Sequence, residues 1–133
     1  MADNLSSETR SKIMSTIRGK NTKPEIKIRK IIWSRNKRYR IHDRTIFGTP
    51  DISNKKRRLA VFIDGCFWHG CSRCYKEPQT NTEFWRTKIK NNRERRKKVI
   101  SKLKVEGWNI MEFWEHEINQ DSKAIARKIV KML

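Results

Sequence analysis

The chain has 133 residues, of which 33 are lysine or arginine and 14 are aspartate or glutamate, so its net charge at pH 7 is +19. This length suits one domain with one compact core, and so large a positive charge indicates a polyanionic partner, most simply nucleic acid. An acidic membrane surface is the second choice, but no apolar stretch approaches the length that spans a bilayer, so we expect no membrane protein.

The composition favours a folded cytosolic protein. Hydrophobic residues make up only 35% of the chain, but five tryptophans and five phenylalanines supply apolar surface for a core. The first residues, MADNLSSETRSK, contain no apolar stretch, so we expect no secretory signal. In a cytosolic setting thiols stay reduced.

Two helices are predicted at the start of the chain. The first begins at Ser6 or Ser7 and ends near Arg18. The second follows a capping box formed by Thr22 and Glu25. The apolar residues of each helix fall on one face: Ile13, Met14 and Ile17 in the first, and Ile26, Ile28, Ile31, Ile32 and Trp33 in the second.

The middle of the chain predicts a sheet. Residues 39–42 alternate in polarity, and a turn-rich connection leads from them into residues 51–52. Residues 54–57 are typical of a hairpin turn. The continuous apolar run 59–63 predicts a central strand.

The C-terminal part predicts two helices around a last strand. Residues 80–83 (TNTE) indicate a second capping box, which begins a long helix that ends near Lys104. Residues 108–114 predict a strand, and residues 122–132 predict a closing helix. This order of elements predicts an α/β sandwich with a small mixed sheet.

The three cysteines indicate a metal site. They lie close together with the spacing C-x4-C-x2-C, at Cys66, Cys71 and Cys74. Such crowding in a reducing compartment is typical of zinc, which takes four tetrahedral sulfur and nitrogen ligands. The alternative is three free thiols.

A fourth zinc ligand has to come from one of the histidines, which are His42, His69 and His116. His69 follows Cys66 by three residues, a cramped spacing for the same metal. His116 lies just past the predicted last strand, and a strand end can return to a neighbouring loop. We therefore favour His116, although it can also merely cap that strand.

A second set of residues indicates nuclease chemistry. Thr49-Pro50-Asp51 at a strand start, followed by a hairpin and a second strand, is the layout of many metal-dependent nucleases, in which the carboxylate holds Mg²⁺. The usual acid–gap–lysine of the second strand is missing, because that strand ends at Asp64. His69 can replace the lysine as a general acid or base. Pro-Asp pairs alone are most often turns.

Glu25 has two predicted roles that do not exclude each other. It completes the capping box of the second helix, and it can orient a metal-bound water from the helix start.

Aromatic and basic side chains indicate a DNA surface. Phe67 and Trp68 lie in a polar loop and cannot easily both be buried, so we expect Trp68 to contact DNA by stacking or wedging. Trp85 lies at the start of the long helix, and Met14 on the first helix is a weaker candidate for the other groove. The alternative is that these aromatics are core residues. The long helix adds a basic face for phosphates: Arg86, Lys88, Lys90, Arg93, Arg95, Arg96, Lys97 and Lys98.

These residues resemble the Vsr family, the very-short-patch mismatch-repair endonucleases. GCFWH and TEFW are the specific segments, and the matching stretches span nearly the whole chain: residues 14–25, 48–52, 60–69, 80–89 and 107–115. The resemblance implies a restriction-endonuclease-like three-layer α/β/α sandwich with a structural zinc site. It implies one domain over residues 1–133, with a DNA-contacting helix at 1–20, in a cytoplasmic, DNA-associated bacterial protein.

The function that the resemblance implies is Mg²⁺-dependent nicking of duplex DNA 5′ to the T of a T:G mismatch, the product of 5-methylcytosine deamination. Asp51 matches the family's metal ligand, assisted by the backbone carbonyl of Ile63. His69 matches the catalytic histidine, and Glu25 matches a residue that supports the metal-bound water. The aromatic residues that the family inserts beside the mismatch correspond to Phe67, Trp68 and Trp85. The residue that the family inserts from the opposite groove corresponds to Met14.

Two positions depart from the family pattern. Some relatives have a second active-site histidine where this chain has Asp64, which we therefore predict to be a carboxylate near the metal. Some relatives have histidine in the zinc loop and cysteine near the last strand, whereas this chain has Cys71 and His116. Four zinc ligands are kept.

Other functions remain open. A restriction or homing-type nuclease of the same fold would keep the chemistry and change the target. A non-catalytic zinc module would bind nucleic acid without cleaving it. We expect a monomer, because the chain is small and its topology closed.

Overall fold

The structure is a computed structural model that describes residues 22–133. The predicted first helix and Met14 lie outside the described residues. In chain order the described elements are α2 (Lys23–Ser34), β1 (Arg40–Ile41), β2 (Ile52–Asn54), β3 (Leu59–Asp64), α3 (Thr82–Val105), β4 (Asn109–Trp114), α4 (Glu115–Gln120) and α5 (Ser122–Met132).

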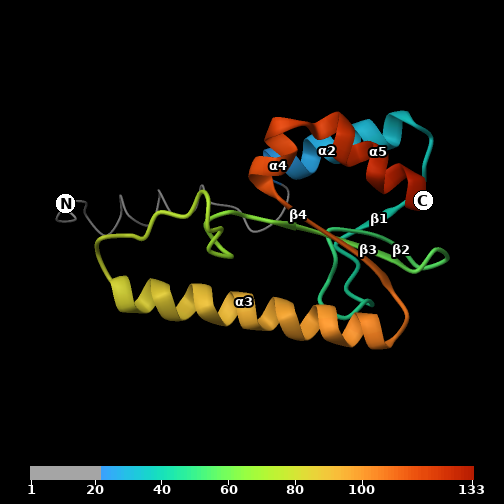
Figure 1. The fold of residues 1–133 in the computed structure, drawn as a ribbon. Helices are drawn as coiled ribbons and strands as arrows, with labels where there is room; N and C mark the ends of the chain where they lie inside the picture. The colour runs from blue at the N-terminus through green and yellow to red at the C-terminus, as the bar shows by residue number, and fades with distance from the viewer. Residues whose placement is uncertain (1–21) are drawn as a thin grey trace.

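A four-stranded sheet in the order β1-β2-β3-β4 forms the middle layer. The first three strands are antiparallel, and β4 runs parallel to β3, so α3 is the crossover between them. Helix α3 lies on one side of the sheet, and α2, α4 and α5 lie together on the other (Figure 1). The predicted three-layer sandwich with a small mixed sheet is confirmed.

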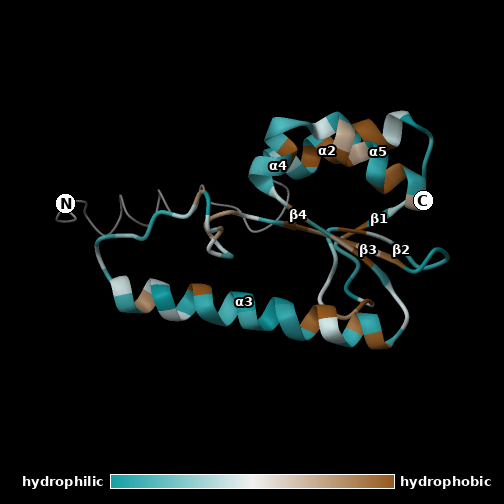
Figure 2. Ribbon diagram, in the orientation of Figure 1, coloured by the Kyte–Doolittle hydropathy of each residue, from teal (hydrophilic) through white to brown (hydrophobic). Residues whose placement is uncertain are grey.

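Strand β3 is buried along its whole length because helices cover both of its faces. Its side chains alternate between two cores. Leu59, Val61 and Ile63 pack with α2 and α5, whereas Ala60 and Phe62 pack with Val99 and Leu103 of α3. Asp64 ends the strand on the Phe62 side, so its carboxyl group faces α3. Figure 2 shows the apolar strands between helices whose outer faces are polar.

The capping box predicted at residues 80–83 is wrong. Asn81 is the N-cap of α3, has a left-handed backbone (φ 56°) and makes no capping hydrogen bond through its side chain. The Thr82 hydroxyl donates back into the preceding loop, to the carbonyls of Pro78 (3.3 Å) and Gln79 (3.4 Å). That loop therefore sets where the helix begins.

Helix α4 is the element that the sequence pattern did not predict. It follows β4 directly, and the carboxylate of Glu117 accepts a hydrogen bond from the backbone N–H of Trp114 at 3.0 Å. Its one buried residue is Ile118, so its six residues show no apolar period. Over residues 22–133, no helix is both long and apolar enough to cross a membrane.

Candidate active site and metal centre

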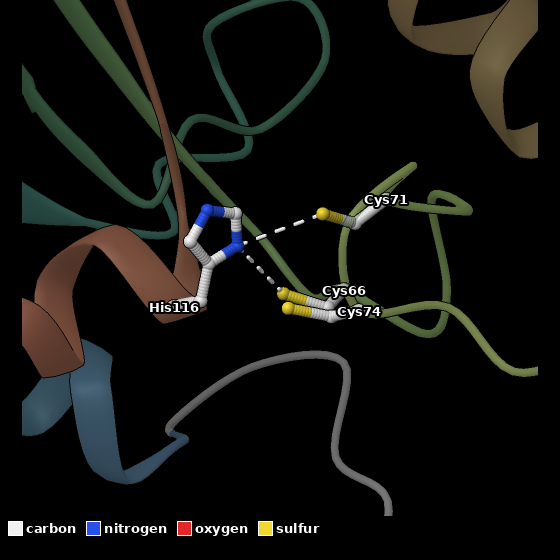
Figure 3. A group of neighbouring side chains, drawn as sticks. All are labelled: Cys66, Cys71, Cys74 and His116. Atoms are coloured by element: carbon white, nitrogen blue, oxygen red, sulfur yellow. Dashed lines mark hydrogen bonds between the residues drawn. The ribbon is translucent and has the colours of Figure 1, made fainter.

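The four predicted zinc ligands lie together at one edge of the sheet. Cys66, Cys71 and Cys74 come from the loop after β3, and His116 is the second residue of α4. Nδ1 of His116 lies 3.5 Å from Sγ of both Cys66 and Cys71 (Figure 3). All four ligand atoms lie within 4.8 Å of one another. A tetrahedral zinc with bonds of about 2.0–2.3 Å needs ligand atoms at about this spacing.

The electrostatics of this cluster suit a cation. The pKa of the Cys66 thiol is raised to about 12, mainly by burial; the neighbouring sulfurs of Cys74 and Cys71 contribute to the rise, and the backbone N–H of His116 opposes it. A divalent ion reverses that balance and holds the thiols as thiolates. The donor set of three sulfurs and one imidazole nitrogen fits zinc better than magnesium or calcium.

The loop that carries the cysteines has a defined path without being a helix or strand. Backbone N–H groups of Cys71 and Tyr75 donate to the carbonyls of Cys66 (2.9 Å) and Cys71 (2.8 Å). Gly70 has a φ of +61°, and a Cβ there would lie 2.6 Å from Cγ2 of Ile89. Glycine therefore lets the loop lie directly against α3.

A second cluster, of Glu25, His42 and Asp51, lies where α2, β1 and β2 begin or end. Nε2 of His42 lies 2.5 Å from Oε1 of Glu25 and 3.8 Å from Oδ1 of Asp51. Oδ2 of Asp51 accepts a hydrogen bond from the backbone N–H of Ile63 at 2.6 Å. We call these three residues the acidic cluster.

The capping role predicted for Glu25 is confirmed, and its predicted role in orienting a metal-bound water stays a prediction. Its carboxylate accepts from the backbone N–H of Thr22 at 3.3 Å, and its own N–H donates to the Thr22 hydroxyl at 3.4 Å, which completes the capping box. The same carboxylate is only 2% exposed and reaches His42. The cap thus fixes Glu25 at the edge of the acidic cluster.

The pKa of Asp51 is raised to about 7, mainly by burial, and the Glu25 carboxylate adds to the effect. The backbone N–H of Ile63 and the charge of Arg96 act in the opposite direction. Two carboxylates this close and this buried repel each other unless a cation or proton lies between them. Oxygen ligands from Asp51 and Glu25 therefore fit a hard divalent cation such as Mg²⁺.

A small cavity of about 70 Å³ joins the predicted catalytic residues. It is lined by Thr22, Glu25, Asp51, Ile63, Gly65, Trp68, His69, Arg96 and Glu115. Asp51, Glu25, Ile63 and His69 were all predicted, and the fold brings them to this one space. The contact seen from Ile63 to Asp51 is made by its N–H, whereas the prediction concerned its carbonyl.

His69 faces the cavity and takes no part in the cysteine cluster. Its pKa is lowered to about 4, mainly by burial, and the charges of Arg96 and Arg95 contribute to the decrease. Its ring is therefore neutral near pH 7 and has a free nitrogen that can accept a proton.

Asp64 lies outside the acidic cluster. Its Oδ1 is 3.0 Å from Nη2 of Arg96 and 3.7 Å from Nε2 of His69. Burial raises the pKa of Asp64, and the Arg96 guanidinium opposes that change. The charge that Asp64 meets is thus a side-chain cation, and its carboxylate also lies near enough to Asp51 to raise the pKa of Asp51. Its predicted place near the metal stays a prediction.

Aromatic side chains form a half-exposed cluster beside the cavity. The ring centroid of Phe67 lies 5.3 Å from that of Trp68 and 5.2 Å from that of Trp85. Phe84 packs edge-on against Trp85 and is 59% exposed. Phe67 and Trp68 are both partly buried, and neither is fully buried. This agrees with the expectation that the two side chains cannot both be buried in the core.

Three residues at or beside the cavity were not singled out from the sequence as parts of the catalytic site: His42, Arg96 and Glu115. His42 had a signal, because antiparallel pairing of Ile41 with Ile52 places it opposite Asp51, and its N–H bonds the Asp51 carbonyl at 3.3 Å. Arg96 was predicted only as one of eight basic residues on the phosphate-binding face of the long helix. Glu115 belongs to the helix α4 that was not predicted.

Comparisons with known proteins agree with this geometry. The sequence profile of the family described as DNA mismatch endonuclease Vsr matches residues 2–76. The type II nicking enzyme V.NmeDIP of Neisseria meningitidis serogroup C is 41% identical over 129 residues, which are 96% of this chain and 87% of that protein. The type II nicking enzyme V.HpaIIP of Haemophilus parainfluenzae is 41% identical over 135 residues, covering 98% of this chain and 95% of its own.

Two further comparisons define the family and the fold. DNA mismatch endonuclease Vsr of Escherichia coli (strain K12) is 38% identical over 117 residues, covering 86% of this chain and 74% of that protein. The catalytic domain of the homing endonuclease I-Bth0305I has a TM-score of 0.54 at 21% identity, over 84% of this chain and 94% of that one. The latter shows the restriction-endonuclease-like fold alone. With these matches, the chain belongs to the Vsr family of DNA endonucleases.

Proposed function

We propose that this protein is a Mg²⁺-dependent endonuclease that nicks one strand of duplex DNA 5′ to the T of a T:G mismatch, with a structural Zn²⁺ at the cysteine cluster. The observation that carries the proposal is the small cavity in which Asp51, Glu25 and His69 meet directly beside the aromatic cluster. The residues proposed for hydrolysis therefore lie next to the aromatic rings proposed to recognise the mismatch.

The residues divide the chemistry of phosphodiester hydrolysis. Asp51 and Glu25 would hold Mg²⁺, which supplies charge for the phosphate and acidity for water. The carbonyl of Ile63, also at the cavity, would assist. His69 would take the proton of the attacking water as the new O–P bond forms and the bond from phosphorus to the sugar oxygen breaks, and the leaving sugar oxygen would take up a proton from solvent water. His42 holds the Glu25 carboxylate in position.

Mismatch recognition is assigned to the aromatic cluster. Phe67, Trp68 and Trp85 contact one another and lie on the loop and helix that flank the cavity. A T:G pair stacks less well than a Watson–Crick pair, so wedging there costs less. Met14 is proposed to enter from the opposite groove.

The test is a strand-resolved nicking assay with all mismatches in several sequence contexts. We expect Mg²⁺-dependent nicking of one strand at T:G duplexes and far slower cleavage of C:G duplexes. Cleavage that follows a particular sequence and ignores the mismatch would instead support a restriction or homing-type role. DNA binding without cleavage of any substrate would support a non-catalytic zinc module.

The setting of this reaction is also proposed. A chain with a charge of +19 suits duplex DNA as its partner in the bacterial cytoplasm. We propose that it acts as a monomer, which sedimentation of the free protein and of its DNA complex tests directly.

A further inference from the structure

We propose that Arg96 binds the phosphate that is cleaved, and that Asp64 is a positioning residue that holds the Arg96 guanidinium in place. This inference rests on the nuclease chemistry proposed above. Among residues 22–133, Arg96 is the arginine that lines the cavity, and the mechanism above has not used it.

Arg96 is unlike the other basic residues predicted for this helix. The Arg96 side chain is only 20% exposed, whereas the other seven residues of the predicted basic face are exposed to solvent. The guanidinium carbon lies 4.1 Å from the centre of the Phe62 ring, and Nη2 lies 3.0 Å from Oδ1 of Asp64. An aromatic face and a buried carboxylate, both on β3, thus hold it in one orientation.

The same guanidinium faces two adjoining spaces. It lines the small cavity with Asp51 and Glu25, and it also lines an open hollow of about 450 Å³ with Trp68 and His69. A DNA strand in that open hollow would bring a phosphate to the mouth of the small cavity. Arg96 is therefore at the boundary where the reacting phosphate has to lie.

Arg96 also retains an unused donor. Within residues 22–133, its buried Nη1 has no hydrogen-bond partner, although Nη2 meets Asp64. A buried N–H group without a partner is costly, and phosphate oxygens are the acceptors that a guanidinium binds best. A bound phosphate would accept a hydrogen bond from Nη1 of Arg96. In the transition state, the same hydrogen bond would stabilise the negative charge that develops on the phosphate oxygens.

The arrangement also accounts for the missing lysine of β3. That strand ends in Phe62, Ile63 and Asp64, without the cation that follows the acid in many nucleases of this layout. Because β3 and α3 face each other, Arg96 supplies a positive charge from the helix, and Asp64 is its partner on the strand. Asp64 acts on the reaction through Arg96.

The experiment measures two quantities for each variant, the affinity for a T:G duplex and the single-turnover nicking rate at saturating protein. For Arg96→Ala we expect a rate loss of about 100-fold or more, which is typical of removing one transition-state donor, with affinity changed by less than about fivefold. Arg96→Lys keeps the charge and should lose about tenfold or more, because lysine cannot replace the planar fork. Guanidinium ion added to Arg96→Ala should restore part of the rate.

The matched control is Arg127→Gln, which removes one exposed arginine on α5, across the sheet from α3. Its rate and affinity should equal those of wild type. Arg96→Ala leaves a buried carboxylate unpaired and can fail to fold. The double variant Asp64→Asn/Arg96→Ala removes both charges, and it should fold and still show the ~100-fold rate loss.

Asp64→Asn tests the positioning role. We expect a rate loss smaller than that of Arg96→Ala, no change in the Mg²⁺ concentration for half-maximal rate, and no further loss when it is combined with Arg96→Ala. A large rise in the Mg²⁺ requirement for Asp64→Asn alone would make Asp64 a metal ligand and overturn its positioning role.

Full nicking rates in Arg96→Ala or in the double variant would overturn the role of Arg96, while wild-type activity would leave the proposed function standing. A wild-type protein that cleaves no DNA in Mg²⁺ would overturn both proposals.

Discussion

The cysteine cluster and the acidic cluster lie near the same edge of the sheet, but they present different ligands in different ways. The first offers three sulfurs and one nitrogen that surround a point, which fills a tetrahedral coordination sphere. The second places Glu25 and Asp51 at the wall of a small cavity, with His42 beside them, which leaves room for water next to the carboxylates. A closed site suits a structural ion, and an open one suits a reacting ion.

The largest effect we expect separates the two clusters by activity. Asp51→Ala removes the carboxylate at the centre of the acidic cluster, so nicking of a T:G duplex should fall by about 1,000-fold or more. Zinc content and DNA affinity should stay near wild type, since neither depends on this side chain. Single-turnover cleavage, metal analysis and a binding titration measure the three quantities, and loss of zinc in this variant would argue that the clusters are not independent.

The next effect separates them by stability. Cys71→Ala removes the buried ligand of the cysteine cluster, so bound zinc should be lost and the melting temperature should fall by about 10 °C or more, because metal binding and folding are coupled. Thermal unfolding with and without added zinc checks this. The exposed Ser72→Ala in the same loop is the control, and an unchanged melting temperature in Cys71→Ala would contradict a structural ion.

His42 sharpens the comparison from inside the acidic cluster. His42→Ala removes the group 2.5 Å from Glu25, so we expect a rate loss of about 10–100-fold and a higher Mg²⁺ requirement, as for other residues that orient metal ligands. His42→Gln should recover part of the rate because its amide can still donate to Glu25. If His42→Ala instead lost zinc, its placement in this cluster would be wrong.

The smallest effect should leave both clusters untouched. Lys97→Gln removes one exposed charge from α3, so the slope of log affinity against log salt concentration should decrease by about one, and single-turnover cleavage at saturation should not change. Binding titrations at several salt concentrations measure the slope. An unchanged slope would show that this part of α3 does not contact phosphate.

The cysteine cluster could be predicted from the sequence because three of its four residues lie within one short loop, so that residues close along the chain are also close in space. Asp51 and the capping role of Glu25 could also be predicted, since both depend on local motifs. The place of His42 beside Asp51 depends on the register of β1 against β2, and the place of Arg96 at the cavity depends on the rotation of α3 about its axis. Neither of these is written in any single stretch of sequence.

The large number of basic residues is a second reason why Arg96 could not be singled out from the sequence. The long helix carries ten lysine and arginine residues, and composition gives no reason to prefer one of them. Packing of Phe62 and burial of Asp64 distinguish it. The capping box at the start of α3 was wrong for a different reason, because Asn81 in a left-handed backbone conformation takes the N-cap position.

The register of β3 and β4 has a consequence for the connectivity of the chain. Asp64 pairs with Trp114, and the residues two positions further along each strand are Cys66 and His116, both ligands of the cysteine cluster. A zinc ion there would close the segment from Cys74 to His116 into a loop that contains all of α3. A protease that cut this loop at one point would therefore leave two fragments joined by the ion as well as by the pairing of β3 with β4, and a chelator would remove the first of these links.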